Sequence, residues 1–229
     1  MLIGGFQKFS LIDYPGKICA IVFTSGCNFR CKYCHNPELV DPQKFPTPVR
    51  EEKILSFLEK RKGKLDAVEI TGGEPTLQHD LLWFIARIKE MGFLVKVDTN
   101  GSNPDVLEKL IDSKVVDYVA MDIKAPMERY YEVTNCKFDI NKIKRSLGLI
   151  MDSDIDYEFR TTVVGSQLLE SDILKIAKLI KGARLYVLQR FIPTKTIDTQ
   201  FATKKSWSKD EFDKVRNRAA NYVKKCIVR

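Results

Sequence analysis

The chain of 229 residues has 44% apolar residues, which is enough for one sizeable hydrophobic core. No apolar run approaches the roughly 20 residues of a membrane-spanning helix, and the first residues lack the charged start and apolar stretch of a signal peptide. The net charge of +8 comes from 38 Lys and Arg against 30 Asp and Glu, scattered along the chain. We therefore expect a cytoplasmic protein of one domain, residues 1–229, and the charge pattern favours neither a nucleic-acid surface nor a membrane surface.

Short apolar segments alternate with amphipathic helical segments along most of the chain. An N-terminal extension over residues 1–16 carries turn signals at Gly4-Gly5 and Pro15-Gly16. Six segments are then predicted as buried strands, each followed by a predicted helix: residues 19–24, 67–71, 93–97, 118–122, 157–164 and 184–190. Residues 194–229 are predicted as a polar loop and a last helix, which begins at a capping box of Ser208 and Glu211. Six parallel strand and helix units predict an α/β fold, either a barrel or a doubly wound sheet.

Three cysteines with the spacing C-x3-C-x2-C, Cys27, Cys31 and Cys34, follow the first predicted strand. Their thiolates can hold one inorganic centre and leave it one ligand short. A structural zinc ion takes four ligands, and a cluster used for electron transfer usually takes four thiolates. His35 could complete a zinc site, but adjacent residues rarely reach one ion together. The spacing therefore favours an iron–sulfur cluster with one open iron. The other cysteines show no spacing for a second cluster: Cys19, Cys136 and Cys226.

Polar motifs stand at the ends of three further predicted strands, namely Gly72-Gly73-Glu74, Asp98-Thr99-Asn100-Gly101 and Asp122-Ile123-Lys124. In a barrel, functional groups collect at the carboxyl ends of the strands. The two glycines permit close backbone approach, and the Glu74 carboxylate can accept hydrogen bonds from an ammonium group. Each motif alone is also typical of a turn or a solvated loop. Their equivalent positions on successive strands indicate one site beside the cysteine loop.

The cysteine motif and these strand ends resemble those of the radical S-adenosylmethionine (SAM) enzymes. The resemblance implies a partial (β/α)6 TIM-like barrel and a [4Fe–4S] cluster on the three cysteines, whose open iron chelates SAM. It also implies a set of cofactor-binding residues: Tyr33 near adenine, Gly72, Gly73 and Glu74 at the methionine part, and Asp98, Thr99, Asn100, Asp122 and Lys124 around SAM. Asp98, Thr99 and Asp122 match positions that hold a monovalent cation, which two carboxylates beside the SAM carboxylate would need. Arg160 and Gln189, in the last two predicted strands, are expected to face ribose, adenine or the SAM carboxylate.

Residues 4–16, 34–38 and 189–193 look like segments of the anaerobic ribonucleoside-triphosphate reductase activating proteins. This resemblance covers nearly the whole chain. It implies an activase that reductively cleaves SAM and removes a hydrogen atom from a glycine of an anaerobic ribonucleotide reductase or another glycyl-radical enzyme. Flavodoxin or ferredoxin would supply the electron, and no catalytic side chain is needed beyond the cluster and the cofactor. The loop over residues 193–207 is a candidate docking segment because it is long and polar.

Two alternatives stay open from the sequence. One is a radical SAM enzyme that acts on a small molecule or a peptide, similar to the 7-carboxy-7-deazaguanine synthases. The other is a non-enzymatic iron–sulfur or zinc protein, and the polar motifs at successive strand ends argue against it.

Overall fold

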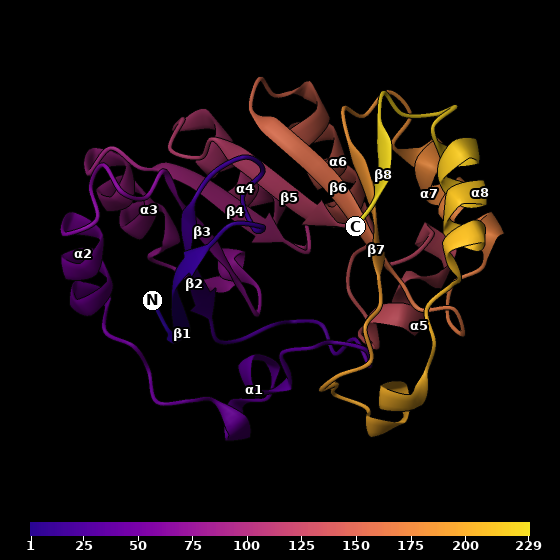
Figure 1. Ribbon diagram of the computed structural model, residues 1–229, viewed down its shortest axis with the longest axis horizontal. Coiled ribbons are helices and arrows are strands. Elements are labelled where there is room, and N and C mark those ends of the chain that lie inside the picture. The colour runs from indigo at the N-terminus through magenta and orange to yellow at the C-terminus, as the bar shows by residue number, and fades with distance from the viewer.

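The computed structural model describes residues 1–229 and contains one eight-stranded sheet (Figure 1). The strands follow one another in chain order, and every neighbouring pair is parallel except the first, which is antiparallel. They are β1 (Ile3–Ser10), β2 (Cys19–Thr24), β3 (Ala67–Gly72), β4 (Leu94–Thr99), β5 (Tyr118–Asp122), β6 (Asp156–Val163), β7 (Tyr186–Arg190) and β8 (Cys226–Val228). The first and last strands are the two edges of the sheet, so the curved sheet forms an open, partial barrel.

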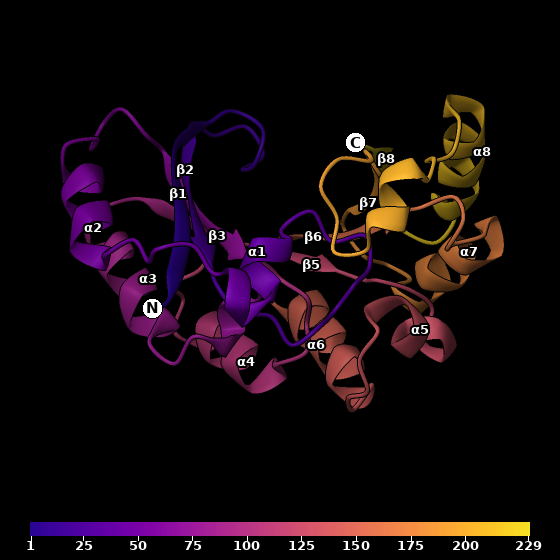
Figure 2. The ribbon, with the colours of Figure 1, turned by 90° about the horizontal axis from the view of Figure 1, so that it is seen from below.

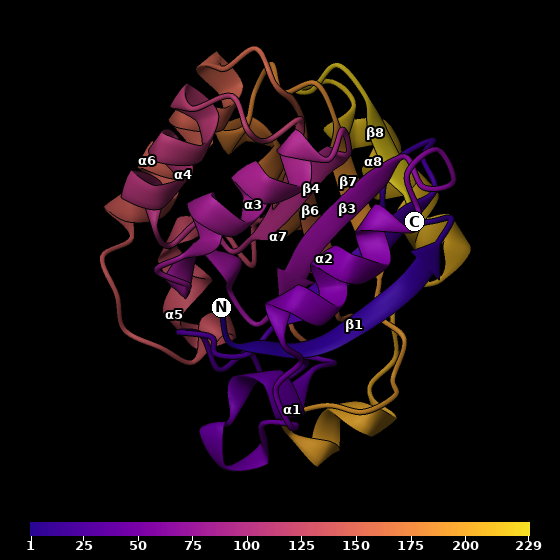
Figure 3. The ribbon, with the colours of Figure 1, turned by 90° about the vertical axis from the view of Figure 1, so that its left-hand side faces the viewer.

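Helices cover the outer face of this sheet. Figure 2 shows them in an arc around the strands, and Figure 3 shows α2, α3, α4 and α6 on the same face. The α-helices are α1 (Pro37–Val40), α2 (Glu51–Glu59), α3 (Leu81–Glu90), α4 (Pro104–Asp112), α5 (Tyr130–Thr134), α6 (Asn141–Asp152), α7 (Glu170–Leu179) and α8 (Lys209–Ala219). Short 3₁₀ helices are η1 (Pro42–Lys44), η2 (Pro75–Leu77), η3 (Met127–Arg129) and η4 (Thr199–Thr203). None of the helices combines the length and the apolar character that crossing a bilayer requires.

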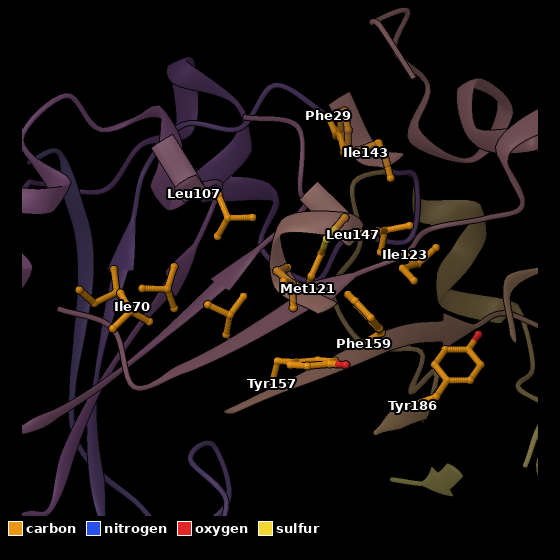
Figure 4. Close-up of a cluster of buried hydrophobic side chains, with 14 of the residues drawn as sticks. Phe29, Ile70, Leu107, Met121, Ile123, Ile143, Leu147, Tyr157, Phe159 and Tyr186 are labelled. Carbon is orange, nitrogen blue, oxygen red and sulfur yellow. The ribbon is translucent and has the colours of Figure 1, made fainter. Parts of the chain in front are cut away.

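The main hydrophobic core lies between the strands and the outer helices. Figure 4 shows core side chains from both layers, among them Ile70, Met121 and Phe159 from strands and Leu107 and Leu147 from helices. Because successive side chains of a strand point to opposite faces, the residues between these core positions face the inside of the barrel. In β4 the core positions are Val95 and Val97, and the intervening Lys96 and Asp98 are buried polar residues. The interior of this barrel is therefore partly charged.

The six predicted strands correspond to β2–β7, with bounds shifted by no more than two residues. The final helix and its capping box at Ser208 are confirmed as well. Two strands, β1 and β8, were not predicted. Residues 226–228 form β8 instead of a loop, and a strand of three residues is too short to show a side-chain period.

The Gly4-Gly5 turn signal was wrong because both residues lie within β1. A Cβ atom at Gly4 would lie 2.3 Å from Ser25 Oγ and 2.5 Å from Leu39 Cδ2. The glycine therefore permits close packing of β1 against the chain around the cysteine loop.

Candidate active site in the open barrel

A pocket opens at the carboxyl ends of β2–β5 and along the inner face of β6. Its empty space, including the open mouth, is about 850 Å³. Every predicted site residue except Gln189 lines this pocket: Cys27, Cys31, Tyr33, Cys34, Gly72, Gly73, Glu74, Asp98, Thr99, Asn100, Asp122, Lys124 and Arg160. Gln189 lies near the carboxyl end of β7, where its Oε1 accepts a hydrogen bond at 3.3 Å from Oγ1 of Thr162, a residue that does line the pocket.

The cysteine loop presents three free thiols to the pocket. Burial raises the pKa of Cys27 to about 12 and that of Cys31 to about 11. Burial also raises the pKa of Cys34. Without a metal these thiols stay protonated at neutral pH, and a bound metal centre would displace the protons because it binds thiolates. The loop itself is closed by the Arg30 guanidinium, which donates to the carbonyl oxygens of Cys27 and Phe29 at 2.5 and 2.9 Å.

The glycines after β3 bring its backbone directly against the cysteine loop. Gly73 N donates to Thr24 O at 2.8 Å, and Glu74 N donates to Gly26 O at 2.8 Å. A Cβ atom at Gly73 would lie 2.1 Å from Gly26 O, and Gly72 has a φ of +113°. Only glycine fits both positions, so any side chain here would separate the two loops that form the pocket wall.

Glu74 ties the end of β3 to the end of β4. Its side chain is 1% exposed, and its Oε1 accepts hydrogen bonds from Thr76 and from Thr99 Oγ1, the latter at 2.7 Å. Its Oε2 accepts one bond from Asn100 N at 2.6 Å. Burial raises the pKa of Glu74. Most of its hydrogen-bonding capacity therefore holds the two loops together, and Oε2 keeps room for a further donor.

Asp98 and Asp122 are bridged by Arg160. The guanidinium Nη1 lies 2.8 Å from Asp98 Oδ2, and Nε lies 2.8 Å from Asp122 Oδ1. Lys124 Nζ lies 2.9 Å from Asp122 Oδ2, and the Thr99 hydroxyl donates to Glu74 instead of facing these carboxylates. A monovalent cation at Asp98, Thr99 and Asp122 therefore stays a prediction, and in this structure Arg160 lies between the two carboxylates. Arg160 already supplies the positive charge that the two carboxylates need.

Two buried titratable residues next to Asp98, Glu69 and Lys96, were not predicted as part of the site. Lys96 Nζ lies 2.7 Å from both Glu69 Oε1 and Asp98 Oδ1, and the two new residues are 1% and 2% exposed. Burial, followed by the charge of Asp98, raises the pKa of Glu69 to about 9, so this carboxyl is protonated at neutral pH. Burial opposes ionisation of Asp98, but Arg160 and Lys96 still hold its pKa well below the usual range. Asp98 is therefore ionised, and it pairs with both Arg160 and Lys96.

Tyr33 supplies an unused polar group at the pocket wall. Its side chain is 5% exposed, and its hydroxyl is buried without a hydrogen-bond partner. Burial raises the pKa of this phenol well above its usual value, so the group is a neutral donor. Buried hydroxyls without a partner are uncommon in folded proteins and point to a ligand that completes them. Three thiols, this hydroxyl and the Lys124 ammonium fit a metal cluster with a polar small molecule beside it.

Fold and site together define an open α/β barrel with a cysteine loop beside a charged pocket. The family model of the Radical SAM superfamily matches residues 21–180, and the chain belongs to this family. Family membership implies a [4Fe–4S] cluster and SAM as cofactors. The predictions of the family, the partial barrel and these two cofactors are thereby confirmed.

Several curated proteins are similar to this chain. One is a protein of Methanocaldococcus jannaschii that is provisionally named a glycyl-radical enzyme activating enzyme. It is 38% identical over 234 aligned residues, and the alignment covers 100% of this chain and 95% of the relative. The pyruvate formate-lyase-activating enzyme of Clostridium pasteurianum is 29% identical over 85% of this chain and 82% of its own. A 7-carboxy-7-deazaguanine synthase of Methanopyrus kandleri is 34% identical over 49% of this chain and 52% of its own.

Solved structures share the fold at low sequence identity. Streptococcus suis SuiB superposes with a TM-score of 0.68 at 12% identity, over 91% of this chain and 48% of that chain. TYW1 superposes with a TM-score of 0.67 at 20% identity, over 90% of this chain and 74% of that chain. The SAM-bound structure of anSMEcpe gives a TM-score of 0.62 at 16% identity, over 86% and 57% of the two chains. This chain thus spans about half the length of SuiB.

Proposed function

We propose that this enzyme activates a glycyl-radical enzyme by removing a hydrogen atom from one of its glycines. The observation that carries the proposal is the 38% identity over the full chain to a relative named for this activity. The match to a pyruvate formate-lyase-activating enzyme over 85% of the chain supports the same class. The segments at residues 4–16, 34–38 and 189–193 favour an anaerobic ribonucleotide reductase as the partner.

In this proposal Cys27, Cys31 and Cys34 hold the [4Fe–4S] cluster. The cluster and SAM supply hydrogen abstraction through one-electron cleavage of the sulfonium, so no catalytic side chain is required. The protein's residues bind and orient. The Lys124 ammonium faces the pocket and attracts the SAM carboxylate, and the Tyr33 hydroxyl offers a donor next to the cysteine loop.

The charged residues beneath the pocket keep this binding geometry fixed. Asp98 and Asp122 stay ionised because each lies within hydrogen-bonding distance of Arg160. Such a prearranged set of charges needs little reorganisation when a ligand binds, and this supports the precise alignment that hydrogen transfer requires.

The remaining assignments belong to the same proposal. Flavodoxin or ferredoxin supplies the electron in the cytoplasm, and residues 1–229 act as one domain. The segment proposed to dock the partner, residues 193–207, packs against the cysteine loop, since Asp198 N donates to Lys32 O at 3.0 Å and Lys195 Nζ lies 2.6 Å from Glu38 Oε2. A protein seated on this segment would therefore lie next to the pocket.

The test is activation of the anaerobic ribonucleotide reductase from the same organism. Anaerobically reconstituted enzyme, SAM, reduced flavodoxin and the reductase are mixed, and electron spin resonance is recorded. A glycyl-radical signal that requires both SAM and an intact cysteine loop is expected. Release of 5′-deoxyadenosine without a glycyl signal from any glycyl-radical enzyme of that organism would contradict the proposal and favour a small-molecule or peptide substrate.

A further inference from the structure

Asn100 connects the end of β4 to the cysteine loop through its side-chain amide. The residue is 6% exposed, and its Oδ1 accepts a hydrogen bond from Ser102 N at 2.9 Å. One N–H of its Nδ2 group donates to Asn28 Oδ1 at 2.9 Å. The same Nδ2 lies within hydrogen-bonding distance of sulfur, 3.9 Å from Cys27 Sγ. An amide nitrogen has two hydrogens, so its second N–H is directed to the thiol.

The orientation of this amide is fixed by its neighbours. Asn28 Nδ2 donates to Ser102 Oγ at 2.8 Å, which leaves Asn28 Oδ1 free to accept from Asn100. A flipped Asn100 amide would place its oxygen against the Asn28 oxygen and its NH2 group against Ser102 N. Both contacts would be repulsive, so the donor must face Cys27. The Phe29 N–H is a second donor to the same sulfur, at 3.4 Å.

We infer that Asn100 is a positioning residue that sets the reduction potential of the cluster through Cys27, in addition to the SAM contact expected for it. An N–H donor stabilises negative charge on a cluster-ligand sulfur, and this charge is larger after reduction. The donor therefore favours the reduced state, from which SAM is cleaved. This inference rests on the proposed role of Cys27 as a cluster ligand.

Asn100, at the end of β4, contacts two loops of the site at once. Its backbone N–H donates to Glu74 Oε2 while its side chain reaches Cys27, so one residue touches the β3 loop and the cysteine loop together. A shift of the Glu74 carboxylate on SAM binding would move the Asn100 donor relative to the sulfur. Such a shift would link SAM binding to the potential of the cluster through one side chain.

The experiment is a redox titration of the reconstituted enzyme without SAM, followed by electron spin resonance of the reduced cluster. Asn100→Ala removes the donor to Cys27. Asn28→Ala is the matched control because it breaks the same bond between the two amides and leaves that donor in place. Iron content is measured first for every variant. If Asn100→Ala loses the cluster, Asn100→Leu is measured instead, since it keeps a similar side-chain shape and removes both N–H groups without adding a charge.

We expect Asn100→Ala to lower the reduced fraction at a fixed potential about threefold or more, a shift of roughly 28 mV or more toward negative potential at 59 mV per tenfold change. Asn28→Ala is expected to change it less than twofold. Equal shifts in both variants, or no shift in either Asn100 variant, would overturn the inference. Wild-type protein that binds no cluster would instead refute the proposed function, so the two failures are distinguishable.

Discussion

Replacing Arg160 by methionine tests whether this guanidinium takes the place of a cation between Asp98 and Asp122. Arg160 is 9% exposed and lies 2.8 Å from both carboxylates. After the substitution each carboxylate keeps one ammonium partner, Lys96 or Lys124. Each carboxylate nevertheless loses one buried contact to the guanidinium, and a hydrogen bond to a charged group typically contributes about 1.5–3 kcal/mol. We expect Arg160→Met to lower the free energy of unfolding by about this amount.

The assay is urea unfolding of the cluster-free protein under anaerobic conditions, followed by far-ultraviolet circular dichroism. Arg145→Met is the matched control, because Arg145 also pairs with two carboxylates, Asp105 and Glu108, but on the exposed surface. Exposed ion pairs contribute little, so this variant should unfold with the wild type.

The interpretation of Arg160 would be refuted by either of two results. One is equal stability of the Arg160→Met variant and the wild type. The other is a wild-type affinity for SAM that depends on one particular monovalent cation at constant ionic strength, since a bound cation and Arg160 would compete for the same carboxylate oxygens.

Three further predictions concern Gly73 and Cys34, which line the pocket, and Glu69, which is buried beside it. Gly73→Ala should destabilise the protein by about 1–3 kcal/mol and weaken SAM binding, because its Cβ atom would lie 2.1 Å from a backbone oxygen of the cysteine loop. Gly148→Ala, in α6 with open space around it, should be neutral or stabilising in the same unfolding assay. Glu69 has a raised pKa, so its contribution to stability is largest below its ordinary pKa of 4.5 and is lost as the pH rises through about 9, by at most about 1.4 kcal/mol per pH unit. Glu69→Gln cannot ionise, so its melting temperature should rise relative to the wild type between pH 6 and pH 9, and a constant difference would contradict the assigned protonation. Cys34→Ser should lose cluster iron after reconstitution while Cys136→Ser retains it, and equal iron content in the two variants would exclude Cys34 as a ligand.

Much of the fold was predictable because the spacing of apolar residues along the chain shows which side of each helix or strand is buried. The strands β2–β7 are short apolar runs between amphipathic helices, and their polar ends are where the pocket lies. The edges of the sheet were harder. The Gly4-Gly5 pair has the composition of a turn, and only the packing of Gly4 against Ser25 and Leu39 shows why glycine stands in a strand.

The site was predictable in its membership but not in its electrostatics. Sequence motifs placed Asp98 and Asp122 at one site, and both line the same pocket, where two neighbouring carboxylates need a positive charge nearby. The source of that charge depends on which strand lies opposite, and Arg160 reaches both from β6, the neighbour of β5. A motif describes the residues of a single strand, so it does not show that Arg160 pairs with Asp98 and Asp122.

The sequence contained one indication of the buried polar residues Glu69 and Lys96 on the inner face of the barrel. Strands of a parallel sheet covered on both faces usually read as continuous apolar runs. In contrast, β4 alternates Val95, Lys96, Val97 and Asp98, and β3 places Glu69 between two apolar residues. Alternation of this kind in a strand with an apolar outer face means that the inner face is polar. Since a buried lysine is stable only with a partner, Lys96 by itself predicts an acidic neighbour on an adjacent strand, and the structure supplies Glu69 at the paired position.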